Sequence, residues 1–236
     1  MHLWRHLMDK IEVKILDHNL NGMAKFLARL TQRGHLINSM ADVEKIYNDC
    51  VDTPPSEYLL TLPHTTIKRM NYLTIAITGL STKAVSQIRT HAKRLTFVST
   101  STQYSSFEGK QARDNYVVPE GITGTALEDI HAAYGLIHSA YSNLIKEGYD
   151  KDKVGYLLPQ GLRKALIISG NLDDWQYVIR TRLCNRNTKE VQYIMRLIYN
   201  EIVNVCGKEY VVGMLPSCVN DKCLEGKFCC GKRFKL

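Results

Sequence analysis

The sequence predicts an α+β fold in which a mixed sheet is flanked by helices. A few β-rich stretches are interspersed with several longer helical patterns, which is typical of this class. Apolar residues make up 44% of the 236 residues and charged residues 23%, which is the balance of an ordinary globular protein. No apolar run approaches the ~20 residues that a membrane helix needs. The first ten residues carry charge and lack the apolar stretch of a signal peptide, so we expect a cytoplasmic protein.

The first half of the chain alternates between segments with β-strand periodicity and segments with α-helical periodicity. Strands are expected where apolar residues alternate and helices where they recur every three or four positions. Gly34 is placed to end the first helix, and Ser39 to begin the second. The predicted order is strand 11–16, helix 21–33, helix 39–50, strand 67–81, helix 82–94, and a hydroxyl-rich loop or edge strand over 95–106.

The second half holds the clearest helix, over residues 125–148. Thr125 and Glu128 have capping-box spacing, Gly148 is placed to end the helix, and an apolar stripe through Tyr141 predicts a core face. His131 and His138 on the same face are expected to be solvated or at the edge of the core. The order then continues with strand 165–169, a helix capped by Asn171, and a last helix over 188–205.

The cysteines divide the chain into two parts. Five of the seven lie in the last 31 residues, so we predict a domain over 1–205 and a Cys-rich basic tail over 206–236. Clustering in a cytosolic chain favours metal or reduced thiols over disulfides. The spacings do not match a zinc ribbon, so no metal site is predicted, and reduced thiols, a disulfide or a structural metal stay open. The residues for such a metal would be Cys206, Cys218, Cys223 and Cys229.

A basic segment followed by hydroxyl side chains is the most informative motif. Gln87, His91 and Arg94 are spaced to share one helix face, and residues 99–105 are rich in hydroxyls. Such donors form a cradle for an anion and a polar ring, although a solvated basic helix end has the same pattern. The net charge of +8 also favours an anionic partner. The chain has no phosphate-binding glycine loop and no nucleophile motif.

This segment resembles the flavin-dependent thymidylate synthases, the thymidylate synthase complementing protein family. The family signature is Arg-His-Arg followed by Ser-x-Arg-Tyr, and this chain has Thr90-His91-Ala92 and then Ser101-Thr-Gln-Tyr. The resemblance spans residues 11–205. Support comes from Pro63-His-Thr-Thr-Ile, Leu158-Pro, Ser169-Gly-Asn-Leu, Trp175, Arg182 and Glu190, which follow the order of the family.

The chain departs from the family at several arginines. Gln103 stands where arginine is usual, and Gly155 occupies the place of an arginine expected shortly before Leu158-Pro159. Thr90 and Ala92 replace the two arginines that flank the histidine, and Lys68-Arg69 replaces the usual Glu-His. These departures leave two substrates open, dUMP and another pyrimidine nucleotide such as UMP.

The resemblance implies an enzyme that methylates dUMP to dTMP. Methylenetetrahydrofolate supplies the carbon, FAD relays hydride, and NADPH reduces the flavin. It also implies a homotetramer whose active sites are shared between subunits, with no membrane partner. The alternative of a basic nucleic-acid-binding protein with a metal-binding tail is disfavoured, because the chain has no interleaved aromatic and basic residues and no finger spacing.

The resemblance also assigns roles to individual residues. Arg182 is expected to contact the pyrimidine, and Ser101 to orient or polarise it without attacking it, so these two are the catalytic candidates. The expected substrate-binding residues are Gln87, Arg89, Ser101, Thr102, Gln103 and Arg182. The expected cofactor-binding residues are His64, Thr66, His91, Lys93, Arg94, Asn171 and Arg186. Asn171 has an alternative role as a helix cap.

Overall fold

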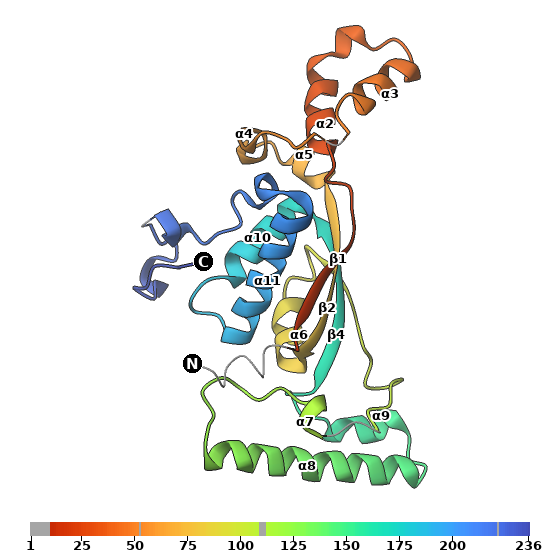
Figure 1. Cartoon of the computed structure of the whole chain (residues 1–236), viewed down its shortest axis with the longest axis vertical. Coiled ribbons are helices and arrows are strands. Elements are labelled where there is room, and N and C mark those ends of the chain that lie inside the picture. The colour runs from red at the N-terminus through yellow and green to blue at the C-terminus, as the bar shows by residue number, and fades with distance from the viewer. Residues whose placement is uncertain (1–9, 52, 109–111, 221) are drawn as a thin grey trace. The chain divides into compact units, whose positions relative to one another are not determined.

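The fold is built on a four-stranded sheet with the strand order β1-β2-β4-β3 (Figure 1). The strands are β1 (Glu12–His18), β2 (Tyr72–Ser81), β3 (Thr96–Ser99) and β4 (Arg163–Asn171). Helices accompany the sheet, so the predicted α+β class is confirmed. The computed structural model describes residues 10–51, 53–108, 112–220 and 222–236. The first ten residues, where the sequence predicts no signal peptide, therefore lie almost wholly outside the described residues.

The central strands run antiparallel. The Leu172 amide donates to the Asn71 carbonyl at 2.8 Å, and the Thr82 amide donates to the Leu162 carbonyl at 2.9 Å. Ascending positions on one strand thus oppose descending positions on the other, which defines an antiparallel ladder. The sheet is antiparallel here rather than mixed. β3 is an edge strand, which confirms the edge-strand alternative for residues 95–106.

The chain divides into two compact units, and β2 and β4 each contribute residues to both. Unit 1 comprises residues up to 12, 77–90 and 97–167, and unit 2 comprises 13–76, 91–96 and 168–236. Unit 1 holds α6 (Thr82–Arg89), α7 (Ala112–Asn115), α8 (Thr125–Lys146), α9 (Lys151–Val154) and η2 (Gly155–Leu157). Unit 2 holds α2 (Met23–Gln32), η1 (Gly34–Leu36), α3 (Met40–Asn48), α4 (Glu57–Thr61), α5 (Thr65–Arg69), α10 (Leu172–Arg182), α11 (Lys189–Cys206), η3 (Lys208–Val211), η4 (Ser217–Asn220) and η5 (Gly226–Phe228).

The long helix α8 forms as predicted but is capped and packed differently. Gly124 is the N-cap and no side chain caps the helix, so the predicted capping box of Thr125 and Glu128 is wrong. Gly148 ends it in the left-handed conformation, with φ +89°, as expected. Tyr141 alone of its residues is buried in the described chain, because only one side of α8 packs on α7 and α9. The His138 ring lies at the edge of this core, 6.3 Å from the Tyr116 ring.

In unit 2, α10 and α11 bury continuous apolar faces. Trp175 is fully buried, and its indole nitrogen donates to the Leu73 carbonyl of β2 at 3.2 Å. The apolar residues that α11 buries are Val191, Ile194, Met195, Ile198 and Ile202. These residues recur at the helical period that predicted the last helix. The buried face of α10 fixes the position of this helix, and Arg182 is its last residue.

Two predicted boundaries are wrong. Residues 67–69 were expected to be strand but belong to α5, and β2 begins only at Tyr72. Residues 90–94 were expected to be helix but form a turn, because α6 ends at Arg89. The Thr90 hydroxyl donates to the Gln87 carbonyl at 2.8 Å, which gives that carbonyl a local partner at the helix end.

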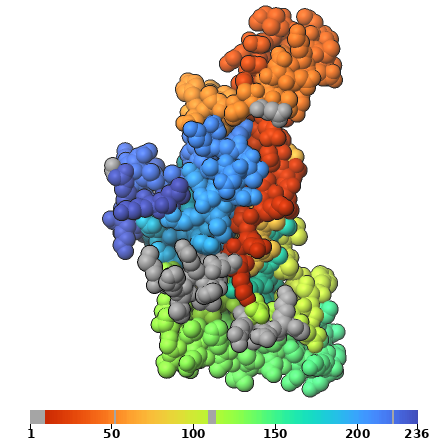
Figure 2. Space-filling model, in the orientation of Figure 1, coloured from red at the N-terminus to blue at the C-terminus, as the bar shows by residue number. Residues whose placement is uncertain are grey.

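The C-terminal tail packs on α11 and the turn before it (Figure 2). Arg196 donates to the Lys235 carbonyl at 2.5 Å, and its guanidinium lies 4.7 Å from the Phe234 ring centroid. All seven cysteines are free thiols. Among the described residues, no group of His, Cys, Asp and Glu side chains is arranged to hold a metal ion. None of the helices in the described ranges is long and apolar enough to cross a bilayer.

Candidate functional site

The predicted site residues fall into two groups, each inside one unit. The group in unit 1 is Gln87, Arg89, Ser101, Thr102 and Gln103. The group in unit 2 is His64, Thr66, His91, Lys93, Arg94, Asn171, Arg182 and Arg186. Within each group, the structure brings some of these residues into direct contact with one another or with their neighbours.

Arg182 and His91 form the centre of the unit 2 group. Arg182 is the last residue of α10, and its Nε donates to His91 Nε2 at 2.8 Å. Its Nη1 donates to Asn187 Oδ1 at 2.9 Å. Both of these acceptors are uncharged, so the guanidinium is oriented without being neutralised by them.

The electrostatics of this pair follow from partial burial. Burial lowers the pKa of His91 below its ordinary value, and the nearby charges of Arg182 and Arg94 lower it further. His91 is therefore neutral at pH 7, which leaves Nε2 free to accept from Arg182. Burial also lowers the pKa of Arg182, while the Tyr177 hydroxyl acts in the opposite direction. The guanidinium keeps its charge, since its ordinary pKa lies far above neutrality.

Arg94 and Tyr177 extend the same group. The Arg94 guanidinium carbon lies 4.0 Å from the Tyr177 ring centroid, within the range of a cation–π contact. Arg94 also donates to Asp174 Oδ1 at 2.8 Å. The Tyr177 ring meets the His91 ring edge to face, with centroids 6.0 Å apart. Tyr177 remains 38% exposed, so an aromatic face and two guanidinium groups are presented together.

Asn171 is engaged as a helix cap. Its Oδ1 accepts from the Asp174 amide at 3.0 Å, and its Nδ2 donates to Asp174 Oδ2 at 2.7 Å. These bonds satisfy an amide at the first turn of α10. The alternative role that the sequence allowed for Asn171 is therefore realised, and Asp174 links this cap to Arg94.

The remaining unit 2 residues are exposed or contact another part of the chain. Lys93 and Thr66 are exposed, and His64 is exposed at the start of α5 without making a side-chain cap. Arg186 donates to the Phe228 carbonyl of the tail at 2.9 Å, and its guanidinium lies 5.3 Å from the Phe228 ring centroid. Arg186 thus packs against the tail.

In unit 1, Ser101 organises a turn. Its hydroxyl oxygen accepts from the amides of Gln103 at 3.0 Å and Tyr104 at 3.3 Å, the geometry of a turn closed by a serine side chain. Arg89 of α6 reaches Ser99 Oγ of β3 at 3.4 Å. Thr102 and Gln103 follow Ser101 in this turn, and Gln87 lies one half-turn of α6 before Arg89.

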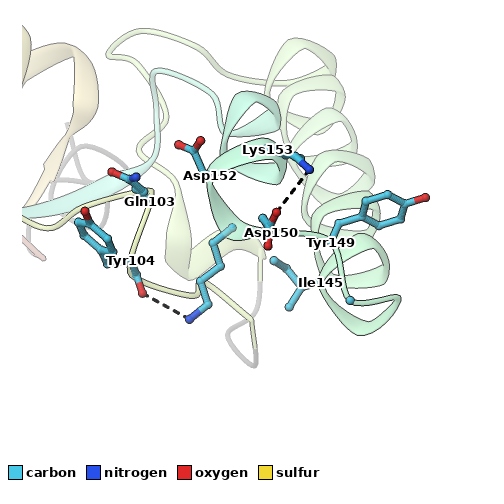
Figure 3. Close-up of a pocket in the computed structure, with 9 residues that line it drawn as sticks. Gln103, Tyr104, Ile145, Tyr149, Asp150, Asp152 and Lys153 are labelled. Atoms are coloured by element: carbon cyan, nitrogen blue, oxygen red, sulfur yellow. Dashed lines mark hydrogen bonds and ion pairs between the residues drawn. The ribbon is translucent and has the colours of Figure 1, made fainter.

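A pocket of about 600 Å³ opens beside that turn, lined by Gln103, Tyr104, the end of α8 and α9. Figure 3 shows Gln103 and Tyr104 across the pocket from Asp150, Lys153 and Tyr149. Lys151 donates to the Tyr104 carbonyl at 3.3 Å, while Lys153 pairs with Asp150 at 3.4 Å. The pocket therefore combines an exposed tyrosine ring, an amide, two ammonium groups and two carboxylates.

Two of the positions where the family has arginine lie next to this pocket. Gln103 lines it. Gly155 follows α9, and a Cβ atom at Gly155 would lie 3.3 Å from the Thr102 carbonyl oxygen. Two changes that are 52 residues apart in sequence thus meet at one place, which indicates a change in what this pocket contacts.

Sequence reasoning missed several residues that complete these groups. Lys164 is 8% exposed, donates to the Thr100 carbonyl at 3.0 Å, and has its pKa lowered by burial. Tyr177, Asn187 and Asp174 hold the Arg182 and Arg94 side chains, and Lys151 reaches the Tyr104 turn. The available signal was the spacing of Asp174 and Tyr177, which puts both residues on one face of α10.

Comparisons with known proteins agree on one family. The model of the thymidylate synthase complementing proteins matches residues 15–207. A flavin-dependent thymidylate synthase from Sulfurisphaera tokodaii is 27% identical over 149 residues, which cover 62% of this chain and 55% of that protein. One from Clostridium tetani is 23% identical over 248 aligned positions, covering 96% of this chain and 95% of that protein.

Solved structures share the fold. Thymidylate synthase X from Helicobacter pylori, solved with FAD and dUMP, has a TM-score of 0.63 at 17% identity and covers 85% of this chain and 99% of its own. The UMP/dUMP methylase PolB from Streptomyces cacaoi, solved with 5-Br dUMP, has a TM-score of 0.66 at 15% identity and covers 87% and 96%. At these identities the likeness concerns the fold.

Proposed function

The chain belongs to the thymidylate synthase complementing protein family, and on that premise we propose that it methylates dUMP to dTMP as a flavin-dependent thymidylate synthase. Methylenetetrahydrofolate is the proposed carbon donor, FAD the cofactor and NADPH the reductant. The curated relatives carry the name of this enzyme. The observation that carries the proposal is the setting of the Arg182 guanidinium. It donates to two neutral acceptors, His91 and Asn187. Arg94 and Tyr177, which stack on each other, belong to the same group.

Arg182 suits a uracil ring that gains negative charge during the reaction. A guanidinium donates two parallel hydrogen bonds to planar acceptors and keeps its charge when half-buried. Charge that is already oriented stabilises a developing anion without reorganisation. We assign this role to Arg182, and we propose that Ser101 holds the turn over residues 101–104 in shape for the substrate through its bonds to the Gln103 and Tyr104 amides.

The residues near His91 fit a flavin dinucleotide. The exposed Tyr177 ring offers a flat aromatic surface, and Lys93 and Arg94 offer cations for phosphate groups. His91, Lys93, Arg94 and Tyr177 would hold FAD, with His64 and Thr66 as further candidates. When bound, FAD supplies hydride-transfer chemistry that protein side chains lack. The chain supplies binding, orientation and electrostatics.

We further propose a cytoplasmic homotetramer whose active sites draw on several subunits. The described α8 supports this, because most of its predicted apolar stripe stays partly exposed and Leu136 is 73% exposed in the single chain. An apolar helix face of this kind is covered when copies associate. Equilibrium sedimentation of the purified chain measures the assembly, and a stable monomer that is active would contradict it.

UMP is the second candidate substrate. Gln103 and Gly155 stand at two arginine positions of the family and lie beside one pocket, so contacts to the nucleotide have changed. The fold neighbour PolB is described as a UMP/dUMP methylase, which supports UMP as a candidate substrate.

The test follows methylenetetrahydrofolate-dependent NADPH oxidation by the purified, FAD-loaded protein with dUMP or UMP. We expect oxidation to require the nucleotide, and the mass of the product to exceed that of the nucleotide by one CH2 unit. Preference for one nucleotide decides between the two substrates. Nucleotide-independent oxidation without a methylated product would contradict both.

A further inference from the structure

We propose that His91 is a positioning residue that holds the Arg182 guanidinium in its nucleotide-binding orientation, and that it does so only as the neutral imidazole. The inference rests on the proposed function, because it assumes that Arg182 contacts a pyrimidine nucleotide. It gives His91 a role toward the substrate, in addition to any contact with FAD.

The geometry makes His91 one of the groups that clamp the guanidinium. His91 Nε2 accepts from Arg182 Nε at 2.8 Å, and Asn187 Oδ1 accepts from Nη1 at 2.9 Å. Bonds to Nε and Nη1 fix the plane of the group, since a guanidinium is rigid and planar. His91 lies in the turn after α6 and Asn187 in the loop after α10. The plane of Arg182 is therefore set by two loops that meet at the end of α10.

The surroundings of His91 make this clamp sensitive to protonation. The groups that face it are Arg182 and Tyr177 from α10 and Arg94 from its own turn, and Asp174 pairs with Arg94. An Nε2 that accepts a hydrogen bond carries no proton, so the neutral ring holds its proton on Nδ1. Protonation at Nε2 removes the acceptor and puts a third positive charge beside the two guanidinium groups. Below the lowered pKa of His91, Arg182 is expected to lose its orientation.

Glutamine at position 91 separates the acceptor from the titration. A glutamine side chain offers a carbonyl oxygen and does not ionise, whereas phenylalanine keeps a ring and offers no acceptor. The matched control is His35→Gln, because His35 is exposed in η1 and belongs to no part of the site. Thermal unfolding of each variant reports whether it folds as the wild type does.

The experiment measures the affinity of the FAD-loaded protein for dUMP and UMP by titration calorimetry from pH 5 to 8. For the nucleotide that binds, we expect wild-type affinity to fall toward acid pH more steeply than that of His91→Gln. The His91→Gln profile then retains the titration of the nucleotide phosphate, whose second pKa is about 6. At pH 7.5 we expect His91→Phe to bind the nucleotide about tenfold more weakly than His91→Gln.

A double variant tests whether His91 acts through Arg182. In an Arg182→Ala background, His91→Phe is expected to cause no further loss of affinity, since the group it positions is absent. Superimposable pH profiles of wild type and His91→Gln, or a full further loss in that background, would overturn the inference alone. If wild type binds neither nucleotide at pH 7.5, the proposed function fails and this inference fails with it.

Discussion

Arg182 is the residue on which the proposed chemistry of the site depends. Its guanidinium is held by His91 and Asn187, and its position at the end of α10 keeps it in the same unit as Arg94. The sequence identified Arg182, His91 and Arg94 through the resemblance to a family. It did not identify Asn187 or Tyr177 as their partners, because those contacts form only when the loop after α10 and the turn after α6 fold against α10.

Replacing Arg182 tests its role directly. We expect Arg182→Ala to lower kcat/KM by about 100-fold or more, because a preorganised charge is lost from the transition state, while FAD remains bound. Flavin absorbance after gel filtration checks the cofactor, and steady-state kinetics check the rate. Arg180→Ala is the control, since Arg180 is exposed on the same helix. Equal turnover of Arg182→Ala and wild type would remove Arg182 from the site.

Lys151 is a cation of the unit 1 pocket, and the sequence analysis did not identify it. It donates to the Tyr104 carbonyl at 3.3 Å beside Gln103, and we expect it to attract the anionic nucleotide. Lys151→Met is predicted to raise KM for the nucleotide about tenfold with little change in kcat, the pattern of lost uniform binding. The control is Lys146→Met, an exposed lysine of α8 that does not line the pocket. An unchanged KM for Lys151→Met would contradict this role.

Among the elements, helices with caps and apolar faces were predictable from sequence, whereas short ones were not. Ser39 caps α3 with a capping box to Asp42, and α10 and α11 follow their apolar periodicity. The five-residue helix α5 is too short for a periodic signal, so its residues were assigned to the next strand. α6 ends early at Arg89 because the turn over residues 90–94 is set by tertiary contacts, which local propensity does not encode.

The N-cap of α10 yields a prediction at this scale. Asn171→Ala is expected to lower the free energy of unfolding by about 1 kcal/mol, since the Asp174 amide loses its acceptor. Asn171→Ser retains an acceptor and is expected to keep most of that stability. Chemical denaturation at pH 7 measures both variants. Equal stability of the alanine variant and wild type would show that the cap contributes nothing.

For the whole molecule, the C-terminal tail is the part whose role the sequence left most open. It packs on α11 through Arg196 and touches Arg186 through Phe228. Its four cysteines beyond α11 are free thiols. The tail contacts α11 through an aromatic ring and a backbone carbonyl, so no cysteine side chain takes part in these contacts.

Accordingly, Cys223→Ser is predicted to leave FAD content, assembly state and thermal stability close to those of the wild type. Absorbance at the flavin bands, sedimentation and thermal unfolding measure the three properties. Simultaneous loss of flavin and of the assembly would instead give the tail thiols a structural role. A conservative Cys184→Ser variant, outside the tail, controls for the general effect of removing a half-buried thiol.

The central claim is that a uracil nucleotide and a flavin share one site on this protein. The most direct test is the absorbance spectrum of the purified, FAD-loaded chain during titration with dUMP and, separately, UMP. A saturable change in the flavin bands with one of them, abolished by Arg182→Ala but not by Arg180→Ala, is the predicted result. A protein that retains no flavin, or a flavin spectrum that neither nucleotide perturbs, would contradict the account.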